Sequence, residues 1–172
     1  GSALAQLVKI EADYYCTNGA IPMADGAIAP VEGTPMDFRT FSPVGRAIHS
    51  DFAQLRQAGG FNHTYVLRKR ERGALELAAS MYDSGSGRKM EVYTTMPGLH
   101  FFTANKTTPR TGKGGAVYDR QFGLCFETQF FPNSAKCTWF PSPVLRKENA
   151  YRQVTEFRFL VSQELENQIT AI

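Results

Sequence analysis

Long hydrophobic runs are missing from this sequence of 172 residues. A membrane-spanning helix needs about 20 consecutive apolar residues, whereas the apolar stretches here, such as residues 157–161, are short and interrupted by charge. We therefore expect no membrane-spanning segment and no membrane partner. Gly1 and Ser2 are typical of an expression scar, and the residues after them lack the basic start and the apolar stretch of a secretion signal.

Cysteine is scarce, and the three that occur, Cys16, Cys125 and Cys137, form no Cys-x-x-Cys pair. An odd number of scattered cysteines is more typical of a reducing cytosol than of a disulfide scaffold, so we expect unlinked thiols and a cytoplasmic location. Excess charge is small as well, since 19 Lys and Arg against 16 Asp and Glu leave a net charge of +3. Nucleic-acid binding usually requires clustered positive charge, so no nucleic-acid partner is expected.

Familiar metal and cofactor motifs are also absent from the sequence. His49, His63 and His100 are too far apart for a local zinc motif such as His-Glu-x-x-His. The glycine-rich residues 112–115 lack the spacing of a phosphate loop, and we interpret them as a surface loop. The basic run at residues 68–72 is interrupted by an acidic residue and is interpreted as a solvated strand end. We expect neither a metal nor a cofactor.

The pattern that is present predicts strands. In residues 7–15, Val8, Ile10, Ala12 and Tyr14 form an apolar face at alternate positions, as in a half-buried strand. Turn residues separate further strand-like segments, and residues 83–87 predict a hairpin turn. Several short strands divided by turns favour an all-β fold, an antiparallel sandwich or barrel. The further segments are residues 61–69, 74–81, 89–95, 99–103, 123–130 and 153–161.

One short helix is predicted near residues 45–57, with Ile48, Phe52 and Leu55 on one face and the Gly59-Gly60 pair as its stop. Residues 162–172 are interpreted as a terminal helix or a tail. No repeat or linker divides the chain, so we expect a single domain over residues 1–172.

Glu127 is the most informative acidic residue, because Cys125, Phe126, Phe130 and Phe131 surround it in the sequence. Partial desolvation among these residues would raise the pKa of the carboxyl group and suit it to accept a proton. The alternative is that Glu127 lies on the solvated face of a strand, where acidic residues are common.

Residues 123–133, Gly-Leu-Cys-Phe-Glu-Thr-Gln-Phe-Phe-Pro-Asn, resemble the Glu-Thr-Gln strand of the galactose mutarotase (aldose 1-epimerase) family. Six further segments agree with this family in the same order, and the resemblance runs from about residue 7 to residue 159. It covers only the C-terminal half of a family whose members are roughly twice as long. The six segments are residues 12–15, 28–39, 60–63, 91–103, 113–118 and 140–146.

The resemblance implies a half-length antiparallel β-sandwich and an enzyme that interconverts the anomers of free aldoses without a cofactor. It implies that Glu127 is the general base. Asn62 stands where the family has a sugar-binding Asp, and His100 where it has a sugar-binding Gln, so both are expected to contact the sugar together with His63. His100 is also a possible general acid, since imidazole titrates near neutral pH; polar residues at strand ends remain the alternative for both histidines.

The other half of the family contributes an Arg, a sugar-binding His and the His that serves as the general acid, and none of these motifs occurs in the chain. We therefore expect a second chain, either another copy or a separate N-terminal-half partner, to complete the site. Two alternatives remain open: a non-catalytic carbohydrate-binding or interaction module, and a scaffold turned to another proton-transfer or cyclisation reaction.

Overall fold

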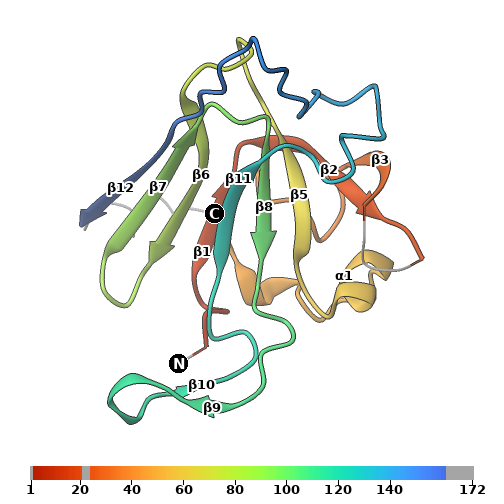
Figure 1. Ribbon diagram of the computed structural model, residues 1–172. Helices are drawn as coiled ribbons and strands as arrows, with labels where there is room; N and C mark the ends of the chain where they lie inside the picture. Colours follow the sequence, from red (N-terminus) through yellow and green to blue (C-terminus); the bar gives the residue numbers. More distant parts are fainter. Residues whose placement is uncertain (1, 21–23, 162–172) are drawn as a thin grey trace.

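The computed structural model describes residues 2–20 and 24–161 (Figure 1). The expected tail at residues 162–172 lies outside the described residues. Strands make up most of the regular structure. They are β1 (Leu7–Ile10), β2 (Ala12–Asn18), β3 (Ala24–Pro30), β4 (Ser42–Pro43), β5 (Asn62–Leu67), β6 (Glu76–Asp83), β7 (Arg88–Thr94), β8 (Gly98–Phe102), β9 (Arg110–Thr111), β10 (Val117–Tyr118), β11 (Cys125–Gln129) and β12 (Thr155–Val161).

Two five-stranded sheets pack against each other and form a β-sandwich (Figure 1). The first sheet has the strand order β12-β7-β6-β1-β4, and the second has the order β11-β8-β5-β2-β3. Neighbouring strands are antiparallel in both sheets. The prediction of an all-β antiparallel sandwich is confirmed, including the hairpin turn between β6 and β7.

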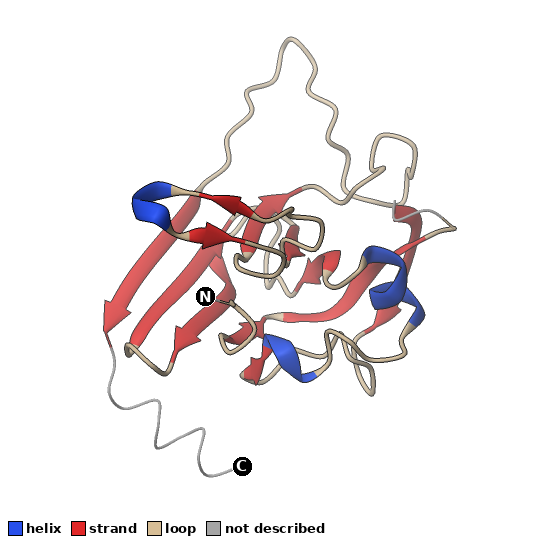
Figure 2. Cartoon of the chain, turned by 90° about the horizontal axis from the view of Figure 1, so that it is seen from below, coloured by secondary structure: helices blue, strands red, loops and turns tan. Residues whose placement is uncertain are grey.

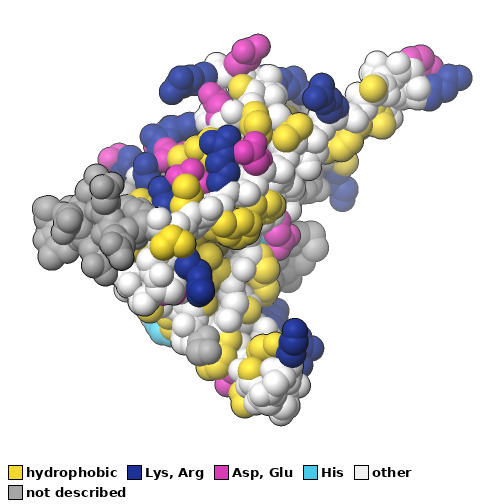
Figure 3. Space-filling model, turned by 90° about the vertical axis from the view of Figure 1, so that its left-hand side faces the viewer, with side chains coloured by type: hydrophobic (Ala, Val, Ile, Leu, Met, Phe, Trp, Pro, Cys, Tyr) yellow, Lys and Arg dark blue, Asp and Glu magenta, His cyan; other side chains and the backbone are white. Residues whose placement is uncertain are grey.

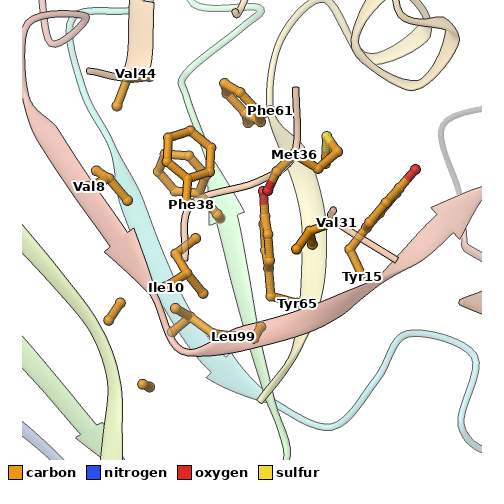
Figure 4. Packing of buried hydrophobic residues seen from close by; sticks show 14 of the residues in the cluster. Val8, Ile10, Tyr15, Val31, Met36, Phe38, Val44, Phe61, Tyr65 and Leu99 are labelled. Carbon is orange, nitrogen blue, oxygen red and sulfur yellow. The ribbon is translucent and has the colours of Figure 1, made fainter. Parts of the chain in front are cut away.

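Side chains from both sheets and from the loop after β3 share one hydrophobic core (Figure 4). The rings of Phe38, Phe61 and Phe101 lie with their centroids 5.1 to 5.6 Å apart, a separation at which aromatic pairs attract. Tyr65 is fully buried and donates its hydroxyl proton to the carbonyl oxygen of Met36 at 3.1 Å. The core therefore fixes β5 and β8 from one side, and their other side faces outward.

The predicted strand at residues 7–15 is in fact two strands in different sheets. The Glu11 N–H donates to the carbonyl oxygen of Ala78 in the first sheet, and the Glu11 carbonyl accepts from Arg68 beside the second sheet. A register shift follows between Ala12 and Tyr14. Tyr14 is consequently 47% exposed, and its neighbour Tyr15 is buried instead. The prediction that Tyr14 continues the apolar face was wrong, because a bulge reverses the alternation.

The short helix predicted near residues 45–57 is confirmed as α1 (Ala53–Ala58), but it begins later than expected, and a separate 3-10 helix, η1 (Val44–Arg46), precedes it. Ser50 and Asp51 lie between them, and both residue types favour turns over helix interiors. Ile48 and Leu55 are buried as expected. The predicted stop is confirmed, since Gly59 caps α1 in the left-handed conformation with φ 73°.

A long connection from β11 to β12 contains no helix or strand and arches away from the sheets (Figure 2). A second 3-10 helix, η2 (Lys113–Gly115), lies in the hairpin of β9 and β10, where the sequence predicted a loop. Among the described residues, no helix has the length and apolar character needed to cross a membrane.

Candidate functional site

Three neighbouring strands of the second sheet carry the polar residues of the predicted site. His100 on β8 lies directly opposite Glu127 on β11 and directly opposite Thr64 on β5. Side chains directly opposite each other in an antiparallel sheet share a face. Asn62 is two residues before Thr64 and therefore lies on the same face. The structure brings Asn62, His100 and Glu127 together, although they are far apart in the sequence.

This face points away from the hydrophobic core. Leu99 and Phe101, which flank His100 on β8, are fully buried in the core, so His100 points outward. Phe126, next to Glu127, packs on the core side with its ring 5.4 Å from that of Phe101. The outward side chains border a hollow of about 430 Å³. It is lined by Ala58, Asn62, His100, Phe102, Asn105, Lys106 and Glu127.

A chain of hydrogen bonds fixes the orientation of the His100 ring. Its Nε2 lies 2.9 Å from Asn62 Oδ1, and its Nδ1 lies 2.9 Å from Thr64 Oγ1. The Gln129 amide donates to the same Thr64 oxygen at 3.4 Å. In both arrangements that satisfy these contacts, Nε2–H donates to Asn62 and Gln129 donates to Thr64. The Thr64 hydroxyl either donates to an unprotonated Nδ1 or accepts from a protonated Nδ1–H.

The electrostatics favour the neutral ring, in which the Thr64 hydroxyl donates to Nδ1. Burial lowers the pKa of His100, and the facing Glu127 carboxylate opposes this shift in part. The single ring proton of the neutral form is on Nε2, where it is already shared with Asn62. This arrangement suits His100 to hold or orient a ligand better than to donate a proton to it.

Glu127 itself is exposed. The sequence left open whether its apolar neighbours desolvate it or whether it lies on the solvated face of the strand. The second interpretation is confirmed, because Phe126 turns to the core and Phe131 belongs to a separate small cluster that also contains Cys16, Cys137 and Phe140. The carboxylate thus reaches the hollow from an open strand surface.

His63 lies on the opposite face of β5 from Asn62, so the structure does not bring it to the hollow. It is buried beneath α1, where its Nε2 lies 3.1 Å from Asn18 Nδ2 and 3.2 Å from Gln54 Oε1. Desolvation, with a smaller effect of nearby His100, lowers the pKa of His63 to about 3. This environment is that of a neutral histidine held by polar partners in the interior.

A sequence profile of the family described as "Aldose 1-epimerase" matches residues 1–158. The chain belongs to the aldose 1-epimerase family. A mouse protein named "Galactose mutarotase" is 38% identical over 156 residues, which are 90% of this chain and 44% of the mouse sequence. An Escherichia coli protein named "Aldose 1-epimerase" is 31% identical over 157 residues, 89% of this chain and 44% of that sequence.

A solved structure of a GalM/aldose epimerase homologue from C. elegans has the same fold, with a TM-score of 0.79 at 21% identity. It is matched over 93% of this chain and 47% of its own chain. A galactose 1-epimerase from Lactobacillus acidophilus gives a TM-score of 0.68 at 22% identity, over 92% of this chain and 45% of its own. The chain therefore spans less than half the length of these aldose 1-epimerase relatives, and the half-length match inferred from the sequence is confirmed.

Three residues near Asn62, His100 and Glu127 were not predicted from the sequence. Thr64 and Gln129 stand two positions after Asn62 and Glu127, so the strand period places them on the same face and could have revealed them. Lys106 lines the hollow from the loop after β8, and no local pattern marks it. Within residues 2–20 and 24–161, no group of three or more His, Cys, Asp or Glu side chains is placed to hold a metal ion.

Proposed function

We propose that this chain carries the general base and part of the sugar-binding surface of an aldose 1-epimerase, which interconverts the anomers of a free aldose. The observation that carries the proposal is the register of β5, β8 and β11, which sets Glu127 opposite His100 and on the same face as Asn62, with all three lining one hollow. Membership of the aldose 1-epimerase family supports the type of reaction.

In the proposed reaction, the Glu127 carboxylate takes the proton of the anomeric hydroxyl as the bond from the anomeric carbon to the ring oxygen breaks. A general acid gives its proton to the ring oxygen, and the open-chain aldehyde forms. Rotation about the C1–C2 bond presents the other face of the aldehyde. The reverse proton transfers then close the ring as the other anomer, so that the enzyme returns to its starting protonation state.

Asn62 and His100 are proposed to hold the sugar. The Asn62 oxygen is engaged with His100, and its amide nitrogen makes no hydrogen bond with any described residue, so this nitrogen can donate to a sugar hydroxyl oxygen. His100 is neutral and shares its ring proton with Asn62. We therefore assign the general acid to a second polypeptide.

The second polypeptide is proposed to be another copy of this chain or a separate chain of the same family. Among the described residues, strand β12 lies at the edge of its sheet and pairs only with β7. Its residues Phe157, Phe159 and Val161 are 47%, 77% and 78% exposed, although Phe157 opposes Val92 of the core. On this side of the molecule, hydrophobic side chains gather across the middle of the surface (Figure 3). Exposed apolar edge strands are sites of association.

Polarimetry of freshly dissolved α-D-galactose and α-D-glucose tests the proposal, with the unmodified chain, Glu127→Gln and a matched control, Glu148→Gln. Glu148 is an exposed residue of the β11–β12 connection. The amide in Glu127→Gln cannot accept a proton, and loss of a general base typically costs about 10²- to 10⁴-fold in rate. We expect that loss in Glu127→Gln and full activity in Glu148→Gln.

Equal rates for the unmodified chain and Glu127→Gln, both above the rate in buffer alone, would remove Glu127 from the role of base. A second function, sugar binding without catalysis, is favoured by the exposure of Glu127 and by the neutral, engaged His100. It predicts that galactose shifts the NMR signals of Asn62 and His100 while the rate of mutarotation stays at that of buffer alone.

A further inference from the structure

A second and larger hollow lies at the other end of β5, β8 and β11. It has a volume of about 900 Å³ and shares no lining residue with the hollow at Glu127. Pockets of about 300 to 1,000 Å³ with mostly apolar walls are typical of small-molecule sites. The walls come from the β5–β6 connection, the β7–β8 turn and the arching connection before β12 (Figure 2). The apolar lining includes Leu75, Met96, Pro97, Phe131, Tyr151 and Val154.

The charged groups of this hollow have one sign. Lys69, Arg72 and Arg152 line it, and its lining contains no Asp or Glu. The neighbouring Arg68 is paired and lies 2.8 Å from a Glu11 carboxylate oxygen. In contrast, Arg72 and Arg152 form no ion pair with any residue of the described chain. Two exposed arginines without an ion-pair partner among the described residues therefore lie beside the apolar lining of the hollow.

Lys69 adds a third cation in a fixed position. Its ammonium group donates to the carbonyl oxygen of Ala74 at 3.2 Å and to that of Thr94. These bonds use two of its three N–H groups. Partial burial of the side chain lowers the pKa of Lys69, and the nearby Glu76 carboxylate, which does not line the hollow, opposes this shift in part. An anion at this position would engage the remaining donor and stabilise the ammonium form.

Apolar side chains that line the hollow are also left partly exposed to solvent. Leu75 and Tyr151 both line the hollow and are 42% and 57% exposed. The hydroxyl of Tyr151 contacts Met96 Sδ at 3.6 Å, so the arching connection is held to the β7–β8 turn at this point. A ligand with an apolar body would cover both exposed side chains and gain the free energy of burying them.

We propose that this hollow is a binding site for a small amphipathic anion, a molecule with one apolar chain or ring and one carboxylate, sulfate or phosphate head. The head lies between Lys69, Arg72 and Arg152, and the apolar body lies between Leu75 and Tyr151. The proposal depends on neither the sugar site nor the proposed reaction.

Isothermal titration calorimetry with laurate below its micellar range tests this site, with dodecyl maltoside and dodecyltrimethylammonium as neutral and cationic probes of the same chain length. We expect one laurate per chain, weakened by salt, and binding of the other two at least ten times weaker. Octyl phosphate and octanoate, compared in the same way, distinguish a phosphate head from a carboxylate head.

The double variant Arg72→Glu/Arg152→Glu is expected to weaken laurate at least tenfold, while the control Arg110→Glu, an exposed arginine of β9, leaves it unchanged. If the double variant does not fold, as judged by circular dichroism, Arg72→Gln/Arg152→Gln takes its place. Equal binding of the three dodecyl probes, an equal loss in Arg110→Glu, or no laurate binding to the unmodified chain would each overturn the proposal.

Discussion

Asn62 shows how one hydrogen bond decides what a site residue offers to a ligand. Its oxygen is occupied by the His100 ring at 2.9 Å, so only its amide nitrogen faces outward as a donor. A carboxylate at the same place would offer acceptors only. If a sugar binds there as proposed, its hydroxyl is expected to accept a hydrogen bond from the protein and to donate its own proton elsewhere.

Asn62→Asp tests the contact between residue 62 and the His100 ring. A carboxylate 2.9 Å from Nε2 favours the charged imidazolium, so the pKa of His100 should rise by about one unit or more. An NMR titration of the histidine ring signals measures it. Asn149→Asp, in the exposed β11–β12 connection, is the matched control and should leave the titration of His100 unchanged; an unchanged titration in Asn62→Asp would contradict the observed pairing.

Sequence motifs were sufficient to predict that Asn62, His100 and Glu127 belong to one site. They did not show on which face of its strand each predicted site residue lies. Asn62 and His63 are consecutive in a strand and so cannot share a face, yet both were expected to bind sugar. Thr64, which contacts His100, and Gln129, which contacts Thr64, were missed because neither has chemistry of its own in the proposed reaction. Their role appears only when the register of three strands is known.

At the level of elements, strands with a regular period were predictable and changes of direction were not. The segments that became β5 to β8, β11 and β12 were expected within about two residues of their observed bounds. The division between β1 and β2 was missed, because it depends on Glu11. The N–H of Glu11 donates a hydrogen bond to the first sheet, and its carbonyl oxygen accepts one from Arg68 beside the second sheet. Strand β3 was also not predicted as a separate strand, since the burial of its side chains does not alternate regularly.

The exposed edge strand β12 can be tested as a contact between two copies of the chain. If the purified chain associates with a second copy through this edge, Phe159→Lys should shift it toward the monomer, because a charge on the apolar row opposes burial. Sedimentation velocity over a range of concentrations measures the shift. Val144→Lys, a substitution of similar size at a residue that is 62% exposed in the β11–β12 connection, should not move the equilibrium. Equal effects of both substitutions would exclude β12 as the contact.

For the molecule as a whole, His63 links pH to the stability of the fold. The ring is buried between α1 and the second sheet, with Asn18 and Gln54 as partners. Burial lowers its pKa from 6.5 to about 3. The folded protein therefore excludes a proton that the unfolded chain binds below about pH 6.5. The stabilisation from a neutral His63 is fully present above pH 6.5 and is lost progressively as the pH falls toward 3.

Urea unfolding at several pH values between 7.5 and 5 tests this link, because most carboxylates titrate at lower pH. In the unmodified chain, the free energy of unfolding should fall by up to about 1.4 kcal/mol per pH unit below pH 6.5 from this one group. His63→Gln removes the titrating ring, so its slope over the same range should be shallower, whatever its stability at pH 7.5. His49→Gln, at an exposed histidine, should keep the original slope. An identical slope in His63→Gln and the unmodified chain would mean that another group excludes the proton.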